Sequence, residues 1–229
     1  MTAVALVLGA GEGLRLGESH PKAGVRIAGR TLLDWATASL ARCDEVDGVL
    51  PVVPRGGEGL LIELERAWLG PARLLPGVPG GNTRQESVAC GVRALEAEGV
   101  EWVLVHDAAR CFVLPEDARV VLLCARETGA AIPVVPVTDT VKELDGERIV
   151  RTLDRHRLAV AQTPQGFRLS LLGEALEKAA RDGVSGTDCA SLVERIGVEV
   201  RTCPGRPENW KVTVPADLPR AEAVLGGGE

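Results

Sequence analysis

The amino-acid sequence predicts an α/β fold, a mostly parallel twisted sheet with helices on both faces and a protruding β-hairpin. Short apolar runs alternate with helix-patterned segments through the first 137 residues, which is typical of parallel strands joined by helices. Several of these runs end in glycine or polar residues, at the sheet edge where such folds bind ligands. The alternation stops between residues 138 and 163, where a hairpin pattern replaces it.

The first half of the chain carries most strands of the predicted sheet. Residues 4–8, VALVL, are a continuous apolar run, as expected for a strand buried on both faces. Residues 47–53 read as a second strand, and Pro51, which cannot donate to a ladder, favours an edge or strand-end position for it. Further strands are expected at residues 72–75, 101–106 and 130–137, and helices at residues 31–40 (capped by Thr31), 59–69, 87–95 and 115–128.

Residues 138–163 are predicted to form a hairpin arm inserted into a single domain of residues 1–229. Two strand-like segments, 141–144 and 147–153, flank Asp145-Gly146, a dipeptide typical of tight hairpin turns. A two-stranded ribbon is only marginally stable alone, so we expect the arm to pack on a partner subunit. Beyond the arm, helices are expected at residues 169–181, 188–196 and 215–225, and strands at residues 199–203 and 209–213.

Composition argues against several functional classes. The net charge is −6, with both signs spread along the chain and no basic block, so we expect no nucleic-acid partner. No segment approaches the roughly 18 consecutive apolar residues of a membrane span, and the apolar start lacks the basic region of a signal peptide. The six cysteines contain no C-x-x-C pair and the three histidines are scattered, which predicts a cytoplasmic protein with reduced cysteines and no zinc site.

A glycine-rich loop, residues 9–13, follows the first strand. Alternate glycines permit a sharp turn with exposed N–H groups, which is a common way to hold phosphate. Arg15 and Lys22 follow at short range, and such cations suit a phosphoryl-transfer transition state. The loop fits neither the dinucleotide fingerprint nor the P-loop pattern, but fits G-x-G-x-R followed by P-K. The alternative is an ordinary strand-to-helix turn beside two solvated cations.

Asp107 is a second candidate, because it stands directly after the apolar run at residues 101–106. A carboxylate at a strand end near a phosphate loop is a suitable Mg²⁺ ligand, since Mg²⁺ prefers oxygen donors. The alternative is that Asp107 caps the following turn. Its neighbour His106 is interpreted as a packed strand residue rather than a catalytic base.

Other polar residues carry weaker indications. Lys211 interrupts an apolar segment between Trp210 and Val212, and Arg155 could simply pair with its neighbour Asp154. Thr187-Asp188 reads best as a helix N-cap.

Taken together, these stretches resemble one known family. The motifs occur in the right order over essentially the whole chain: G-A-G-E-G-L-R-L with P-K, G-G-N-T-R-Q-E-S-V, V-L-V-H-D-A-A-R, D-T-V-K, L-D-R, Q-T-P-Q, G-T-D and N-W-K-V-T. The chain thereby resembles the 2-C-methyl-D-erythritol 4-phosphate cytidylyltransferases. The glycine loop is shared with many nucleotidyltransferases, whereas H-D-A-A-R combined with R-Q-E-S-V and K-V-T is specific.

The resemblance implies a Rossmann-like nucleotidyltransferase domain that joins CTP to methylerythritol phosphate, a polyol phosphate, with Mg²⁺ as cofactor. It implies a homodimer in which the hairpin arm of one subunit completes the site of the other. The residues implied in catalysis are Arg15, Lys22, Arg155 and Lys211. Those implied in CTP binding are Ala10, Gly11, Gly81, Asn82, Arg84, Ser87 and Asp107, of which Asp107 also holds the metal. Those implied in binding the polyol phosphate are Arg110, Thr140, Thr163, Thr187 and Asp188.

The chain departs from the usual family pattern at four positions, and other readings stay open. Gly9 replaces alanine, Asn82 replaces a frequent aspartate, and Cys111 and Cys189 stand where proline and glutamate are common. A near alternative is a cytidylyltransferase for another polyol phosphate, such as ribitol 5-phosphate. More distant ones are a molybdopterin or sugar-phosphate nucleotidyltransferase, and a nucleotide-binding regulator without catalysis.

Overall fold

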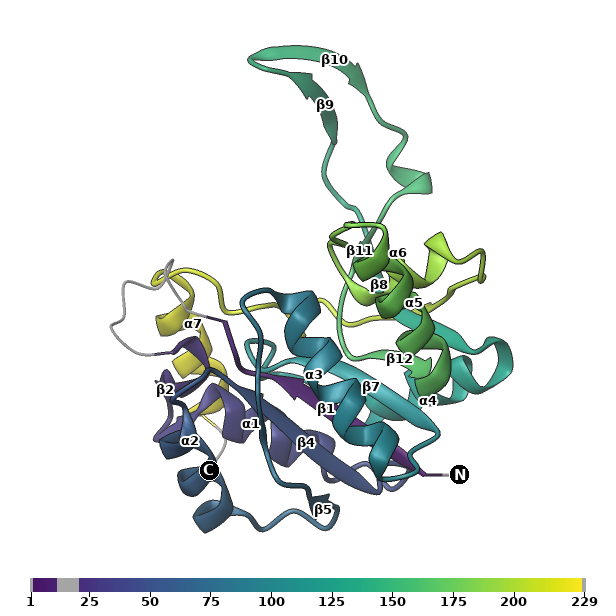
Figure 1. The fold of residues 1–229 in the computed structure, drawn as a ribbon. Helices are drawn as coiled ribbons and strands as arrows, with labels where there is room; N and C mark the ends of the chain where they lie inside the picture. The colour runs from purple at the N-terminus through teal and green to yellow at the C-terminus, as the bar shows by residue number, and fades with distance from the viewer. Residues whose placement is uncertain (1, 12–20, 228–229) are drawn as a thin grey trace.

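A central sheet with helices packed on both faces forms the body of the protein, and a hairpin projects from one end of it (Figure 1). The computed structural model describes residues 2–11 and 21–227. The α/β class predicted from the sequence is confirmed. The details that differ from the prediction concern the place of the strand Gly48–Val53 in the sheet, the antiparallel strands, the start of the helix Arg84–Ala97 and the segment before the last helix.

Nine strands within the described residues form the central sheet. Seven run in one direction: β1 (Ala3–Leu8), β4 (Gly48–Val53), β5 (Arg73–Leu74), β6 (Val78–Pro79), β7 (Trp102–Asp107), β8 (Ala130–Pro136) and β13 (Arg201–Pro204). Two run the other way: β11 (Ala159–Ala161) and β12 (Gln165–Arg168). The order is β11-β8-β12-β7-β1-β4-β5, with β13 beside β8 and β6 beside β4. The prediction of a mostly parallel sheet is therefore correct.

Helices cover both faces, which explains the continuous apolar strands. Ala3, Ala5 and Val7 of β1 lie in one core, and Val4 and Leu6 lie in the other. The first core is covered by α1 (Leu32–Leu40), α2 (Glu58–Ala67) and α4 (Pro115–Thr128), and the second by α3 (Arg84–Ala97), α5 (Leu169–Arg181) and α6 (Cys189–Arg195). None of the helices in the described ranges is long and apolar enough to cross a membrane.

A third, smaller apolar cluster supports the C-terminal part of the chain. It joins Ile27, Phe112, Val212 and Ala221, and the Trp210 ring lies 4.5 Å from the Phe112 ring. The cluster brings together β2 (Arg26–Ile27), α1 and α7 (Asp217–Leu225), and the short elements η2 (Lys22–Gly24) and β3 (Arg30–Thr31) lie on either side of β2 in the sequence. It therefore fixes the segment around Lys211 to the body of the protein.

The expectation that Pro51 marks an edge strand is wrong, because β4 lies inside the sheet. One side of β4 pairs with β1 from Gly48 to Val52. The other side pairs with β5 at Gly48 and Val49 and with β6 at Val52 and Val53. Pro51 lies between the residues that pair with β5 and those that pair with β6. Neither partner strand needs a hydrogen bond from the main-chain nitrogen of Pro51, so the proline is tolerated there.

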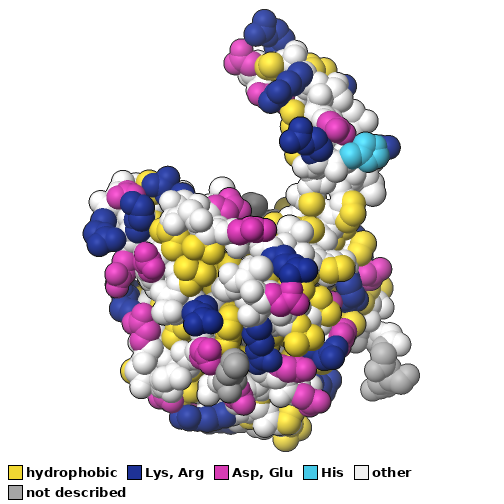
Figure 2. Space-filling model, turned by 90° about the vertical axis from the view of Figure 1, so that its right-hand side faces the viewer, with side chains coloured by type: hydrophobic (Ala, Val, Ile, Leu, Met, Phe, Trp, Pro, Cys, Tyr) yellow, Lys and Arg dark blue, Asp and Glu magenta, His cyan; other side chains and the backbone are white. Residues whose placement is uncertain are grey.

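The predicted hairpin is present as β9 (Lys142–Asp145) and β10 (Arg148–Thr152), which pair antiparallel around Gly146. Gly146 has a φ of 59°, the left-handed conformation that such turns favour. The hairpin stands off the body and carries charged and apolar side chains together (Figure 2). Leu144 and Ile149 are 60% and 58% exposed. Residues 159–161, expected within the arm, instead form β11 in the central sheet.

Two further expectations need correction. Residues 209–213 do not form a strand; among them, Val212 donates its amide to Ala109 at 2.9 Å, without a ladder. The helix expected over 87–95 is longer, because the Thr83 side chain caps α3 by accepting the amide of Glu86 at 3.1 Å. The capping pattern T-x-x-E at residues 83–86 was therefore a helix start that the prediction missed.

Candidate active site

Loops that are distant in the sequence meet at the carboxyl edge of the parallel strands. β1 and β7 end side by side, with Leu8 opposite Asp107. The amide of Gly9 donates to the carbonyl of Val52 at 2.7 Å, which holds the glycine loop against the end of β4. β6 runs beside that end of β4 and leads into the loop of Asn82. The expectation that these polar segments follow strand ends is correct.

Gly9 lies where the backbone passes close to its neighbours. A Cβ atom at this position would come within 2.9 Å of the Ala23 Cβ and 3.2 Å of the Val52 carbonyl oxygen. Alanine at this position would therefore require a shift of the chain. Ala10 and Gly11 follow and end the first described range.

Of the two cations expected beside the glycine loop, Arg15 lies outside the described residues. Lys22 opens η2 and is partly buried. The pKa of Asp217 is lowered chiefly by the amides of Val214 and Thr213, and the charge of Lys22 adds to this effect. Lys22 therefore lies near the segment that carries Lys211.

The second loop is built by the start of α3. Gly81 has no space for a side chain, since a Cβ atom there would lie 2.3 Å from the Cβ of Glu86. The amide of Gly81 donates to the Ser87 hydroxyl at 3.2 Å, and this hydroxyl donates to the Thr83 carbonyl at 2.9 Å. Ser87 is buried and holds the loop, whereas Asn82 is exposed at its tip.

The centre of the site is a carboxylate held between two cations. Arg84 Nε lies 3.1 Å from Asp107 Oδ1, and Lys211 Nζ lies 2.7 Å from Asp107 Oδ2. Burial alone would raise the pKa of Asp107, but the charges of Arg84 and Lys211 outweigh it and keep the pKa well below its usual range. Asp107 is therefore ionised at neutral pH, and it fixes two cations at the strand edge.

The donor chemistry at Asp107 is compatible with Mg²⁺. Mg²⁺ is commonly held by one or two carboxylates together with substrate phosphates and water, and Asp107 is an ionised carboxylate at the sheet edge. In the described ranges, no group of three or more His, Cys, Asp or Glu side chains could hold a metal without a substrate. The residues fit a metal that arrives with a polyphosphate.

His106 is fully buried and neutral, as the sequence predicted for a packed strand residue. Its Nε2 lies 3.2 Å from the Arg110 carbonyl, which can only accept, so Nε2 carries the proton. Its Nδ1 lies 3.0 Å from the hydroxyl of Thr163, which also accepts the Asp107 amide at 3.1 Å. Burial lowers the pKa of His106 to about 4. His106 and Thr163 thus orient the strand end that carries Asp107.

Acidification is expected to destabilise the fold through His106. Its pKa falls from 6.5 to about 4 on folding, so within this window only the unfolded state takes up the proton. Stability from this group is complete above pH 6.5 and is expected to decrease by about 2 kcal/mol at about pH 5. Urea denaturation of the wild type and of His106→Gln, once above pH 6.5 and once at about pH 5, measures this loss of stability. An equal pH dependence in the two proteins would contradict it.

Arg110 forms no ion pair with a carboxylate among the described residues. Its Nη1 donates to the Asn209 carbonyl at 2.8 Å and its Nη2 to the Ala161 carbonyl at 3.4 Å. Its pKa is lowered by burial, against the opposing effect of Asp107. A guanidinium held by neutral carbonyls retains its charge for an incoming anion.

The remaining predicted residues lie outside the contacts of Asp107. Asp188 caps α6, as predicted, by accepting the Ser191 amide at 2.9 Å, and the neighbouring Thr187 is exposed. Thr140 and Arg155 belong to the connections of the hairpin. Arg155 donates to the Thr138 carbonyl at 2.7 Å, rather than pairing with its neighbour in sequence.

Sequence reasoning missed the buried polar residues that hold these loops together. Gln165 donates to Asp188 Oδ2 at 2.8 Å and accepts the amide of Cys189 at 3.2 Å. Gln162 and Asn209 are 5% and 1% exposed. The Q-T-P-Q motif contains both glutamines, but nothing in the sequence indicated their distant partners.

The class of the protein follows from this arrangement. The glycine loop after β1 and the aspartate that ends β7 lie side by side, as the resemblance to nucleotidyltransferases implied. The family model described as "IspD: 2-C-methyl-D-erythritol 4-phosphate cytidylyltransferase" matches residues 3–227. The chain belongs to this family.

Individual relatives agree with this assignment. A 2-C-methyl-D-erythritol 4-phosphate cytidylyltransferase of Rhodococcus jostii is 44% identical over 233 residues, covering 98% of this chain and 96% of the relative. A bifunctional enzyme IspD/IspF of Nitrobacter hamburgensis is 44% identical over 223 residues, covering 96% of this chain but 54% of the relative. The chain thus spans about half the length of such bifunctional relatives.

Solved structures show the same fold. The crystal structure of 2-C-methyl-D-erythritol 4-phosphate cytidylyltransferase from Thermus thermophilus has a TM-score of 0.79 and 40% identity, covering 99% of this chain and 100% of that one. The crystal structure of 4-diphosphocytidyl-2C-methyl-D-erythritolsynthase from Anaerococcus prevotii has a TM-score of 0.85 and 27% identity, covering 98% and 96% of the two chains.

Proposed function

We propose that this chain transfers a cytidylyl group from CTP to 2-C-methyl-D-erythritol 4-phosphate, giving CDP-methylerythritol and pyrophosphate in non-mevalonate isoprenoid biosynthesis. The observation that carries the proposal is the ionised Asp107 between Arg84 and Lys211, at the strand edge that holds the glycine loop. Membership of the family supports this choice of substrates. We further propose a cytoplasmic location, in keeping with the free cysteines.

The reaction is an in-line displacement at the α-phosphorus of CTP. An oxygen of the acceptor phosphate forms the new P–O bond as the bond to pyrophosphate breaks, and the pyrophosphate takes the electron pair. The acceptor is already an anion, so no general base is needed. This agrees with the neutral, fully buried state of His106. Positioning and charge neutralisation supply the rate.

The nucleotide is assigned to the two glycine-containing loops. Ala10, Gly11 and the cations Arg15 and Lys22 hold the phosphates, with both cations stabilising the charge that develops at the α-phosphate. The loop at the start of α3 holds the base and ribose through Gly81, Asn82, Arg84 and Ser87. Mg²⁺ bound by Asp107 would neutralise phosphate charge and ease departure of pyrophosphate.

The acceptor is assigned to Arg110 and Lys211 and to residues of the neighbouring loops. Arg110, held by two carbonyl oxygens, and Lys211 supply positive charge for its phosphate. Thr140, Thr163, Thr187 and Asp188 complete the pocket around the polyol. Thr163 also helps to position Asp107, because its hydroxyl accepts a hydrogen bond from the Asp107 amide.

We propose that two copies of the chain share their sites through the hairpin arm. Every residue of β10 is exposed, and Leu144 and Ile149 present apolar side chains to solvent. A hollow of about 800 Å³ at the base of the arm is lined by Val134, Arg155, Leu158, Pro204 and other residues. A second copy that covers these surfaces would bring its own Arg155 to the active site of the first copy. The active form is therefore a homodimer.

Pyrophosphate release tests the proposed function. The enzyme is incubated with CTP and Mg²⁺, with methylerythritol 4-phosphate and ribitol 5-phosphate supplied in parallel. Release with the first acceptor alone is expected. Release only with ribitol 5-phosphate would retain the mechanism and overturn the substrate. Release with neither would overturn the proposal.

Mixed dimers test whether Arg155 acts across the interface. Arg155→Ala is expected to weaken binding of the polyol phosphate, and Lys22→Ala to block turnover. After the two variants are mixed, one site of each heterodimer combines an intact Lys22 with an intact Arg155. Random reassociation should restore about one quarter of all sites. Activity equal to the sum of the separate variants would exclude the shared site.

A further inference from the structure

The segment that delivers Lys211 has no regular secondary structure. Between the end of β13 and the start of α7, residues 205–216 form neither helix nor strand. The Lys211 Nζ nevertheless lies 2.7 Å from Asp107. Irregular backbone needs specific side-chain contacts to hold one conformation, and Arg206 supplies several of them.

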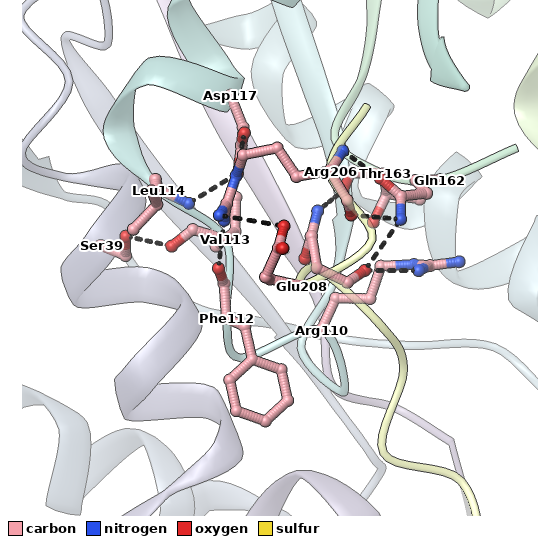
Figure 3. Close-up of polar contacts among 11 residues, drawn as sticks. Ser39, Arg110, Phe112, Val113, Leu114, Asp117, Gln162, Thr163, Arg206 and Glu208 are labelled. Carbon is pink, nitrogen blue, oxygen red and sulfur yellow. Dashed lines mark hydrogen bonds and ion pairs between the residues drawn. The ribbon is translucent and has the colours of Figure 1, made fainter. Parts of the chain in front are cut away.

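Arg206 ties this segment to the loop that follows β7 (Figure 3). Its Nε and Nη2 lie 2.8 and 3.2 Å from the two carboxylate oxygens of Asp117, and Nη2 also donates to the Phe112 carbonyl at 2.9 Å. Asp117 is 10% exposed in its side chain, and its carboxylate also accepts the Leu114 amide at 2.8 Å. A bidentate ion pair of this kind fixes the orientation of the guanidinium group as well as its distance from the carboxylate.

Buried amide side chains continue the same network. Gln162 donates to the Arg206 carbonyl at 2.8 Å and accepts the Arg206 amide at 3.2 Å. Asn209 donates from its side-chain Nδ2 to the Thr163 carbonyl at 2.9 Å. The main-chain carbonyl of Asn209 accepts a hydrogen bond from Arg110 Nη1 at 2.8 Å. Arg110 and Lys211 therefore both depend on the segment that begins at Arg206.

We propose that Arg206 is a positioning residue for Lys211 and Arg110, the two cations assigned to the acceptor phosphate. The Arg206 side chain contacts Asp117, Glu208 and the Phe112 carbonyl rather than Asp107. Its role is to fix the path of residues 206–211, so that Lys211 meets Asp107 and the Asn209 carbonyl orients Arg110. The inference rests on the proposed function only for its kinetic consequence.

Chemical labelling tests the geometry without substrates. Reductive methylation followed by peptide mass spectrometry gives the labelling rate of Lys211 relative to Lys142 and Lys178, which lie elsewhere on the surface. In Arg206→Gln, we expect the Lys211 rate to rise several-fold while the rates of the other two lysines stay unchanged. Arg119→Gln is the matched control, since Arg119 forms an ion-paired contact on the same helix as Asp117, away from the segment.

Steady-state kinetics provides the second measurement. In Arg206→Gln, kcat/KM for the polyol phosphate is expected to decrease by about 10- to 100-fold, because displaced cations lose transition-state contacts. KM for CTP should change little. In a Lys211→Ala background the same substitution should cost much less, since the two residues act as a unit. Arg206→Lys keeps the charge but cannot form the bidentate ion pair with Asp117. It should therefore recover only part of the lost kcat/KM.

The results separate positioning from stability. Loss of stability in Arg206→Gln, with wild-type Lys211 labelling and unchanged kinetics of the folded protein, would overturn the inference. If Arg206→Gln does not fold, the same comparison is made with Arg206→Lys. Failure of the wild type to release pyrophosphate with either acceptor would overturn the proposed function, while the labelling would still decide the role of Arg206.

Discussion

Asp107→Asn is expected to lower kcat by about 10²-fold or more, because it removes the charge that holds two cations and the proposed metal ligand. The substitution keeps the size of the side chain but leaves Arg84 and Lys211 close together without a counter-charge. The free energy of unfolding should also fall, by about 2 kcal/mol. Steady-state pyrophosphate release and urea denaturation measure the two effects.

A matched control exists next to α5. Asp182 is also bridged by two cations, Lys178 at 3.2 Å and Arg195 at 3.3 Å, but it is exposed and lies away from the site. Asp182→Asn should therefore leave kcat and stability nearly unchanged. If Asp107 holds Mg²⁺, its variant will also need more Mg²⁺ for half-maximal activity. A kcat within a few-fold of the wild type would remove Asp107 from the centre of the mechanism.

Lys22→Ala is expected to cut turnover by about 10²-fold or more, with a smaller effect on CTP binding, because the charge acts mainly on the transition state. Lys22→Arg should retain more activity than Lys22→Ala, since it keeps the charge. Single-turnover kinetics with saturating CTP separates chemistry from binding.

Lys178→Ala serves as the control for Lys22→Ala, since it also removes one positive charge but from the outer surface of α5. It should leave turnover unchanged. Near-normal turnover in Lys22→Ala would exclude Lys22 from catalysis.

The parallel part of the sheet could be predicted because burial on both faces is visible in the sequence. Residues 4–8 are apolar without interruption, and in the structure their side chains enter two separate cores. Asp107 could be found for the same reason, as the polar residue that ends a buried strand. The hairpin was visible through Asp145-Gly146, a local turn pattern.

The rest depends on contacts between distant residues, which a local pattern does not contain. β12 has four residues, one of them glycine, and lacks the apolar run of the parallel strands. Gln162 is separated from its partner Arg206 by 44 residues in the sequence. The strand predicted at 209–213 was wrong because its alternating pattern reflects Trp210 and Val212 packing in the third apolar cluster. No ladder partner lies beside it in the described residues.

The place of β12 in the sheet has a consequence for biosynthesis. Within the described residues, β12 pairs with both β7 and β8 and so joins the two halves of the sheet. A nascent chain must therefore emerge beyond Arg168 before β12 can cover the free edge of β7. Until then, that edge can pair with other chains. Ribosome-bound chains from which Arg168 has not yet emerged should consequently need more chaperone protection than chains long enough to expose it.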